Sequence, residues 1–174
     1  TCPGCGVDLV AHQGKKVPWH FKHASGDLCN HAVESALHLR AKEILSVSNR
    51  VMLPPLSVSS KIEGDGDIEF RSRLDVVKPG YELFINETTC VEKTVNDIRP
   101  DLIVYRSGRP LLIEIAVTHF VSREKKQKIR KLGMSCIEID LSSYKNQVID
   151  DDALSNLIVT DIKHKKWIYL SLKH

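Results

Sequence analysis

The feature that most constrains this chain is the stretch RPDLIVYRSGRPLLIEIAVTH, residues 99–119, in which two apolar runs flank a glycine-containing turn. Apolar runs of this length on either side of such a turn are typical of a β-hairpin. Taking RSGR (106–109) as a four-residue loop sets the register, in which the facing pairs are Tyr105 with Pro110, Ile103 with Leu112, and Asp101 with Glu114. Each strand therefore carries one carboxylate in an otherwise apolar sequence, and the two carboxylates are predicted to be neighbours.

The pairing of Asp101 with Glu114 needs a physical reason. Directly opposed residues on one face of a sheet have Cβ atoms about 5 Å apart, and like charges in that position are destabilising. A cation between them removes the repulsion, and proteins bind Mg²⁺ through one or two carboxylates together with waters and substrate phosphates. The hairpin therefore predicts a site for Mg²⁺ or Mn²⁺. The alternative is that both acids lie on a solvent-facing side of the sheet.

The N-terminal segment, 1–31, carries a separate pattern. Cys2 and Cys5 form a C-x-x-C knuckle, and His20, His23 and Cys29 follow it. Zinc prefers four nitrogen or sulfur ligands in a tetrahedron, and an odd count of 5 cysteines argues against a disulfide framework. The preferred ligand set is Cys2, Cys5, His23 and Cys29. His20 is the alternative third ligand, because an extended backbone sends His20 and His23 to opposite faces.

This zinc is predicted to be structural, since a closed cysteine-rich shell leaves no position for a reacting water. A segment this short cannot hold a core of its own, so the metal would supply its folding free energy. The alternative is a buried thiol pair without metal. We therefore divide the chain into a zinc-binding module over 1–31 and an α/β core over 32–174. Thiols that stay reduced lead us to expect a cytoplasmic protein.

The segment NHAVESALHLRAKEILSVSN (30–49) has the spacing of an amphipathic helix, with apolar positions at Val33, Leu37, Ala41, Ile44 and Leu45. Glu34, His38 and Lys42 recur every four residues, so they share one side of that helix. Such a stripe is either a surface ladder contributing about 0.2–0.5 kcal/mol per pair or a set of functional groups aimed at one site.

The rest of the chain indicates a mixed α/β domain. Short strands and turns are expected over 57–80, and strands near 81–85, 88–94, 101–105 and 111–117. A helix over about 121–132 should end at Gly133 and lead into a strand at SCIEIDLS, with a helix and an amphipathic strand or helix to follow. Strand, strand, helix, strand is the order of a mixed sheet. No apolar run approaches the roughly 18 residues of a membrane span.

Several of these motifs, in this order, resemble known nucleases. The helix, the hairpin with Asp and then Glu, and the following helix and strand are similar to the PD-(D/E)xK nuclease superfamily. More narrowly, CPGC, HFKH followed by Cys29, ESALHLRAK, RPDLIV and IEIAVTH resemble the competence-protein CoiA-like nucleases. The resemblance runs from Cys2 to about Leu141. It implies a PD-(D/E)xK restriction-endonuclease-like core with a small N-terminal zinc module.

By this resemblance, Asp101 and Glu114 bind the metal of a nuclease centre, and Glu34 approaches the same centre. His38 and Lys42 lie further along the helix, in reach of a metal-bound water or the scissile phosphate. Mg²⁺ would polarise a phosphodiester and lower the pKa of the attacking water. The implied activity is that of a Mg²⁺-dependent deoxyribonuclease.

The residue two after Glu114 departs from the family pattern. The superfamily motif has lysine there and CoiA-like proteins often have glutamine, whereas this chain has Ala116. A positive group near the attacking water must then come from elsewhere, and the candidates are Lys125 on the following helix, which we favour, Lys42 and Lys93. Thr118 and His119 follow directly and are further candidates to face the site.

Ala116 leaves a second hypothesis open, a catalytically inactive nucleic-acid-binding or adaptor domain on a nuclease-like scaffold. The net charge is only +3, but basic residues cluster at 122–131 and again over 161–174. Such clusters suit a polyanion, or else form a solvated helix face. The expected partners are DNA, a second copy in a homodimer, and other nucleic-acid-processing proteins, with no membrane.

Overall fold

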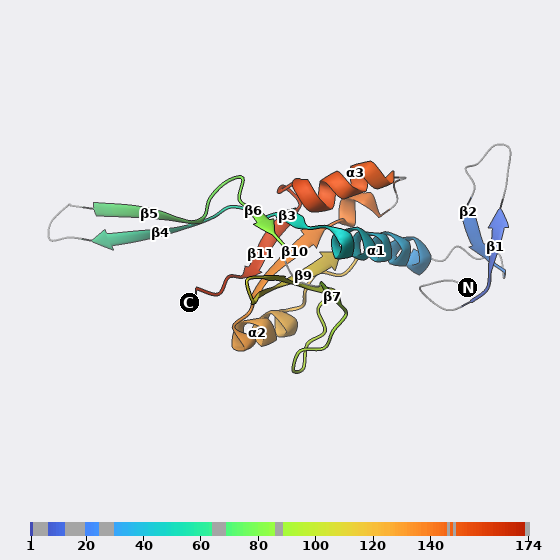
Figure 1. Cartoon of the computed structure of the whole chain (residues 1–174), viewed down its shortest axis with the longest axis horizontal. Helices are drawn as coiled ribbons and strands as arrows, with labels where there is room; N and C mark the ends of the chain where they lie inside the picture. Colours follow the sequence, from blue (N-terminus) through green and yellow to red (C-terminus); the bar gives the residue numbers. More distant parts are fainter. Residues whose placement is uncertain are drawn as a thin grey trace.

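A five-stranded mixed sheet forms the centre of the protein, with helices on both faces (Figure 1). The structure is a computed structural model, and it describes residues 1, 7–12, 20–24, 30–63, 69–85, 89–145, 147 and 149–172. In spatial order the strands are β11 (Lys165–Tyr169), β10 (Ser135–Asp140), β9 (Arg109–Ala116), β8 (Leu102–Arg106) and β7 (Cys90–Val91). Strands β9 and β10 run parallel and the other neighbours antiparallel, so the predicted mixed α/β arrangement is confirmed.

The core is divided between the two faces of this sheet. Helix α1 (Asn30–Val47), helix α3 (Asp151–Ser155) and the π-helical turn η2 (Asn156–Thr160) contribute to the larger apolar cluster, whereas helix α2 (Arg123–Leu132) contributes to the smaller one. Successive residues of a strand point to opposite faces. On β9, Ile113 accordingly belongs to the larger cluster and Leu112 to the smaller. Glu114 therefore lies on the face that α2 covers.

Both longer helices form where the sequence predicts them. The described positions of the predicted apolar face, Leu37, Ala41, Ile44 and Leu45, are buried, and the helix ends at Val47, two residues before the predicted end. Helix α2 begins after Ser122, whose hydroxyl accepts a hydrogen bond from the backbone N–H of Lys125 at 3.2 Å. It ends at Gly133, which has the left-handed φ of 71° that favours glycine, as predicted.

The turn of the β8–β9 hairpin is shorter than predicted. Arg106 pairs with Arg109, so the loop is the two residues Ser107 and Gly108, with φ of 49° and 75°. Positive φ at both central residues is the type I′ geometry, whose twist suits the flanking strands. The predicted register is nevertheless correct, because two- and four-residue loops centred on the same bond give the same facing pairs, Tyr105 with Pro110 and Ile103 with Leu112.

The remaining strands form small two-stranded sheets. β3 (Arg50–Met52) pairs with β6 (Glu82–Phe84), and β1 (Leu9–His12) pairs with β2 (His20–His23) near the N-terminus. Where short strands and turns were predicted over 57–80, β4 (Leu56–Glu63) and β5 (Glu69–Val77) form one long hairpin that projects from the body (Figure 1). A 3-10 turn, η1 (Ser142–Tyr144), follows β10.

The strand predicted over 88–94 and the last predicted element can both be compared with the structure. The strand predicted over 88–94 is shorter, because only Cys90–Val91 pairs with β8. The last predicted element, left open between strand and helix, is strand β11. Among the described residues, no helix combines the length and apolarity needed to cross a membrane. The division into a module over 1–31 and a core over 32–174 stays a prediction.

Candidate active site

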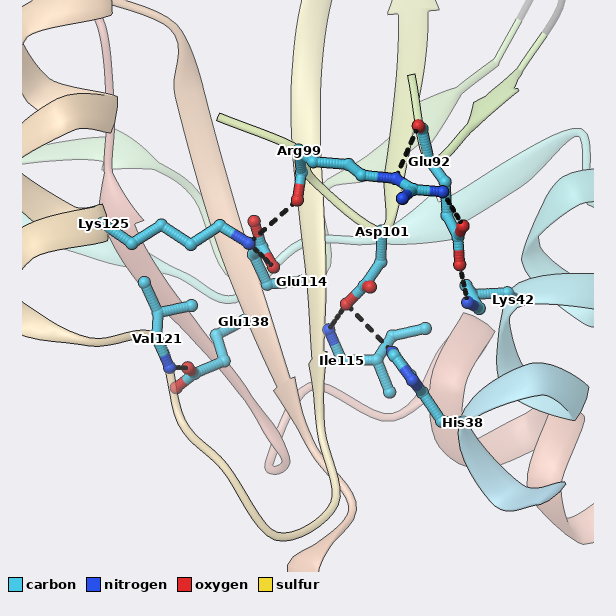
Figure 2. A network of polar contacts seen from close by, with 10 residues as sticks. All are labelled: His38, Lys42, Glu92, Arg99, Asp101, Glu114, Ile115, Val121, Lys125 and Glu138. Atoms are coloured by element: carbon cyan, nitrogen blue, oxygen red, sulfur yellow. Dashed lines mark hydrogen bonds and ion pairs between the residues drawn. The ribbon is translucent and has the colours of Figure 1, made fainter. Parts of the chain in front are cut away.

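Asp101 and Glu114 both lie at the end of the β8–β9 hairpin that is remote from the turn (Figure 2). The last strand pair is Leu102 with Ile113. One residue further, Asp101 Oδ2 accepts a hydrogen bond from the backbone N–H of Ile115 at 2.8 Å. The Asp101 side chain thus takes the place of a ladder carbonyl and is fixed beside β9.

Glu114 is contacted by a lysine from the covering helix. Lys125 Nζ lies 2.7 Å from Glu114 Oε2 and 3.0 Å from the backbone oxygen of Arg99 (Figure 2). The Glu114 side chain is 6% exposed. Its other oxygen, Oε1, is buried and has no hydrogen-bond partner among the residues that the structure describes. One carboxylate oxygen is therefore neutralised while the other is left to accept a ligand.

The pKa of the Glu114 carboxyl is raised to about 7. Burial is the main cause, and the nearby charges of Asp101 and Glu138 act in the same direction, whereas the ion pair with Lys125 opposes them. Burial without a full set of partners favours the neutral acid. A cation bound between the carboxylates would remove this penalty, because it stabilises the ionised form.

Asp101 is held in the ionised form by its surroundings. His38 Nε2, from α1, lies 3.1 Å from Asp101 Oδ2, on side chains that are 29% and 18% exposed. Burial alone would raise the pKa of Asp101, but His38 and the backbone N–H of Ile115 outweigh it, so the pKa is below its usual value. The two neighbouring acids, Asp101 and Glu114, thus have pKa values that are shifted in opposite directions.

Lys42 lies on the same side of α1 as His38, but it contacts a different acid. Its side chain is 7% exposed and forms an ion pair with Glu92, which also pairs with Arg99 (Figure 2). Arg99 Nε donates to the backbone oxygen of Glu92 at 3.0 Å as well. Lysine and arginine side chains on both sides hold the pKa of Glu92 below its usual value. Lys42 therefore helps to hold the segment between β7 and β8 in place through its ion pair with Glu92.

Glu138 is a site residue that our sequence analysis missed. It is 0% exposed and stands in register with Glu114 across the parallel β9–β10 pair. Its Oε1 accepts from the backbone N–H of Val121 at 2.5 Å, and its Oε2 lies 2.6 Å from Lys166 Nζ. Asp101, Glu114 and Glu138 thus form a row of acids across three neighbouring strands or their ends, β8, β9 and β10.

The other predicted residues occupy varied places. Ala116 is 2% exposed, so the strand position that carries lysine in the family motif is filled by a buried methyl group here. Thr118 Oγ1 and His119 Nδ1 are 3.0 Å apart and contact each other. Lys93 is exposed. Glu34 lies in α1, and its side chain is outside what the structure describes.

Asp101 and Glu114 suit a hard divalent cation. Two carboxylates, one with an unpartnered buried oxygen, match the way that Mg²⁺ binds through few protein ligands and retains waters. Within the described ranges, no group of three or more His, Cys, Asp and Glu side chains is arranged to hold a metal ion by itself. Waters or substrate oxygens would therefore complete the coordination shell.

The predicted zinc ligands fall mostly outside the described part of the chain. Cys2, Cys5 and Cys29 are not described, and of His20 only the backbone is. His23 ends strand β2, opposite Leu9. The extended backbone expected between His20 and His23 is present as this strand. The zinc site itself stays a prediction.

A cavity of about 290 Å³ adjoins the carboxylate row, lined among others by Arg99, Ser122, Lys125 and Lys128, with Asp97 and Glu124 also on its wall. Lys128 pairs with Asp97 at 3.0 Å.

No protein-family model, curated protein or solved structure matches the chain.

Proposed function

We propose that this protein is a metal-dependent endonuclease that hydrolyses phosphodiester bonds in DNA, on a core of the PD-(D/E)xK type. The observation that carries the proposal is the environment of Glu114: one buried oxygen is unpartnered, the other is bound by Lys125, and the charge of Asp101 acts on the carboxyl. Two neighbouring acids with a lysine are the set that phosphodiester hydrolysis needs, namely ligands for a cation and a fixed positive charge.

The topology supports the same proposal. A helix, α1, precedes a hairpin whose strands carry the acids, and a helix and a parallel strand follow, α2 and β10. This is the order on which the resemblance to PD-(D/E)xK and CoiA-like nucleases rests. The resemblance itself is part of the proposal, because it was recognised from the sequence motifs alone.

In the proposed mechanism, Asp101 and Glu114 hold Mg²⁺ or Mn²⁺, which when bound supplies a Lewis acid at the phosphodiester. Asp101 is already ionised at neutral pH, since His38 and the Ile115 N–H keep its pKa low. Glu114, whose pKa is raised to about 7 by burial, would hold the cation as a carboxylate, so its proton would be released on binding. Proton release on metal binding is thus expected near neutral pH.

Lys125 takes the role that the residue at position 116 has in the family motif. Its ammonium is held at the Glu114 carboxylate by α2, so it is placed to orient the attacking water and to offset negative charge on the phosphate. The basic residues of α2 (Arg123, Lys125, Lys126, Lys128, Arg130, Lys131) provide phosphate contacts that do not depend on sequence.

A catalytically inactive nucleic-acid-binding or adaptor domain is the second candidate. The observation in its favour is that both acids have partners without metal, because Lys125 pairs with Glu114 and His38 Nε2 lies 3.1 Å from Asp101 Oδ2. Ala116 agrees with it. In that case the basic surface of α2 would bind DNA, and the acids would serve the stability of the core.

Nicking of supercoiled plasmid with Mg²⁺ or Mn²⁺ separates the two candidates, with Asp101→Ala and Glu114→Ala as controls. The nuclease requires metal-dependent cutting that is lost in both variants, while DNA affinity stays within a few-fold of the parent. The adaptor is favoured if the folded parent protein binds DNA but cuts neither single-stranded nor double-stranded substrates.

We also propose that Cys2, Cys5, His23 and Cys29 bind a structural zinc ion. The support is the ligand chemistry of the N-terminal segment, which offers enough thiolate and imidazole groups for a closed tetrahedral site. His20 stays the alternative to His23. This site and the carboxylate row would take different metals, since thiolates favour zinc and carboxylates favour magnesium.

A further inference from the structure

The β4–β5 hairpin, here called the arm, has one apolar and one polar face. The facing pairs Val58–Leu74, Ser60–Ser72 and Ile62–Phe70 alternate with Ser59–Arg73, Lys61–Arg71 and Glu63–Glu69. Because alternate positions of a strand share a face, Val58 and Leu74 lie together on one side of the ribbon, and Ser59 and Arg73 lie on the other. The two described apolar side chains of that face, Val58 and Leu74, are 52% and 66% exposed.

In the part of the chain that the structure describes, the arm has no packing layer of its own that would make it stable in isolation. It is a two-stranded sheet of its own and projects away from the central sheet (Figure 1). An isolated two-stranded hairpin is at best marginally stable in water, and a third layer over its apolar face is what normally stabilises it. Among the described residues, no element covers the face that bears Val58 and Leu74. The arm therefore calls for a surface from another molecule.

The same chain offers an apolar groove of matching character at the root of the arm. A cavity of about 900 Å³ is lined by Leu53, Leu83, Leu111, Trp167, Leu170 and Leu172. Val76 and Val77, where β5 leaves the arm, lie on its edge. Leu172 is 65% exposed, so the groove is open to a partner. It lies by the β8–β9 turn, at the end of the hairpin remote from Asp101 and Glu114.

Charge identifies the partner. Residues 56–77 carry three basic residues against five acidic ones, a net charge of −2 in a chain whose total is +3. An acidic arm is repelled by DNA phosphates, so it is not a β-ribbon for a DNA groove. The mouth of the apolar groove is basic instead, since exposed Arg106 and Arg109 flank the β8–β9 turn. The arm complements the chain's own groove in both polarity and charge.

We propose that two copies of this chain form a symmetric dimer in which the arm of each copy lies, apolar face inward, in the groove of the other. A two-fold axis repeats the same contact twice, because the arm of one copy meets the groove of the second and the reverse holds as well. The contact buries the exposed face of Val58 and Leu74 and brings the acidic arm to Arg106 and Arg109. Both carboxylate rows stay outside the interface.

The first test is sedimentation equilibrium of the full chain, which should show the mass of two copies. Val58→Glu puts a charge on the apolar face, and Ser59→Glu puts the same charge at the next position, on the polar face opposite Arg73. We expect Val58→Glu to raise the dimer Kd by at least about tenfold and Ser59→Glu to leave it unchanged. Monomeric parent protein, or equal effects of the two substitutions, would overturn the proposal.

A mixing experiment shows whether arm meets groove or arm meets arm. Leu172→Glu charges the groove at an exposed side chain, so it should weaken the dimer as Val58→Glu does. A mixed dimer of the two variants retains one intact contact, between the arm of the Leu172→Glu copy and the groove of the Val58→Glu copy. We therefore expect mixing to recover part of the dimer. If arms paired with arms, Leu172→Glu would have no effect and mixing would recover nothing.

Discussion

The ammonium of Lys125, in the first turn of α2, lies 2.7 Å from the carboxylate of Glu114 near the C-terminal end of β9. The two residues are 11 positions apart in the chain, and the contact depends on how α2 packs over the sheet. In the proposed nuclease, Lys125 would supply from a helix the positive charge that the PD-(D/E)xK motif, which the sequence resembles, carries on the strand. This relationship makes the proposed nuclease testable at single side chains.

The first prediction concerns Lys125 itself. Lys125→Ala should lower the rate of plasmid nicking about 10²–10⁴-fold, because a group placed at the attacking water contributes a factor of that size. Lys126→Ala, on the same helix, removes one charge without touching Glu114 and should change the rate only a few-fold. A sharper form is the double variant Lys125→Ala/Ala116→Lys, since position 116 lies on the same face of β9 as Glu114. Recovery of cutting in the double variant would show that a lysine at position 116 can replace Lys125. Equal rates for Lys125→Ala and the parent would show that Lys125 has no part in the mechanism.

The second prediction concerns the pH dependence of stability. Burial raises the pKa of Glu114 from 4.5 to about 7, so the folded state binds a proton more tightly than the unfolded state. The contribution to the free energy of unfolding is therefore complete below about pH 4.5 and is lost as the pH rises to about 7. Glu114→Gln imitates the neutral acid, so at pH 8 without metal it should be more stable than the parent by up to about 3 kcal/mol.

Urea unfolding with a chelator between pH 4 and pH 8 measures this effect. The difference between Glu114→Gln and the parent should grow with pH and level off above about 7. Added Mg²⁺ should stabilise the parent at pH 8 and leave Glu114→Gln unchanged, because the amide is a poor ligand for that ion. A difference that is the same at every pH would show that Glu114 titrates normally.

The third prediction assigns a positioning role to Glu138. Its Oε1 fixes the backbone N–H of Val121, two residues before α2 begins, so it sets where the helix that carries Lys125 starts. Glu138→Ala should cost about 1–3 kcal/mol of stability, because the Val121 N–H loses its buried acceptor. Glu138→Gln keeps an acceptor and should retain most of the cutting activity. If Gln and Ala variants lose activity equally, the charge of Glu138 matters, and it acts at the metal instead.

The fourth prediction separates Lys42 from catalysis. Because Lys42 is buried against Glu92, Glu92→Ala leaves an uncompensated ammonium and should destabilise the fold by about 3 kcal/mol. Lys42→Met keeps the volume and removes the buried charge, so it should cost less. We expect Lys42→Met to keep its cutting activity once it is folded. Loss of cutting with unchanged stability would instead make Lys42 the missing lysine.

The fifth prediction concerns the N-terminal segment. Cys2→Ser should lower the zinc content of the purified protein from one ion per chain to near zero, because a hydroxyl is a weak zinc ligand. Metal analysis by mass spectrometry measures this directly. Cys136→Ser is the matched control, since Cys136 lies buried between the sheet and α2. Zinc that is retained in Cys2→Ser would exclude Cys2 as a ligand.

Local sequence patterns predicted much of the site. The register of the β8–β9 hairpin followed from two apolar runs and a turn, and Gly133 predicted the end of α2. The choice of Lys125 followed from the expectation that a helix after β9 packs back over that strand. Each of these inferences needs only neighbours within about 15 residues, where periodicity and turn chemistry are informative.

What the sequence did not predict depends on longer-range pairing. Glu138 sits in an apolar run, and its place beside Glu114 requires the parallel register of β9 with β10, which no local pattern specifies. Glu92 lies in an irregular segment with φ of 51° and meets Lys42, 50 positions away. Helical periodicity and the resemblance to nucleases together placed Lys42 near the predicted metal site, and neither indicated its contact with Glu92.

The two-residue turn at Ser107 and Gly108 sets the register of the two strands that carry the site. Pairing counts outward from it, so Asp101 and Glu114 stand the same number of positions from the turn, one residue beyond the last pair of the ladder, Leu102 with Ile113. A one-residue slip in the pairing of β8 with β9 would turn the side chains of the slipped strand to the other face of the sheet, and no side-chain adjustment restores that. Insertions or deletions at this turn therefore preserve the facing pairs of the hairpin when they are symmetric about the bond between Ser107 and Gly108.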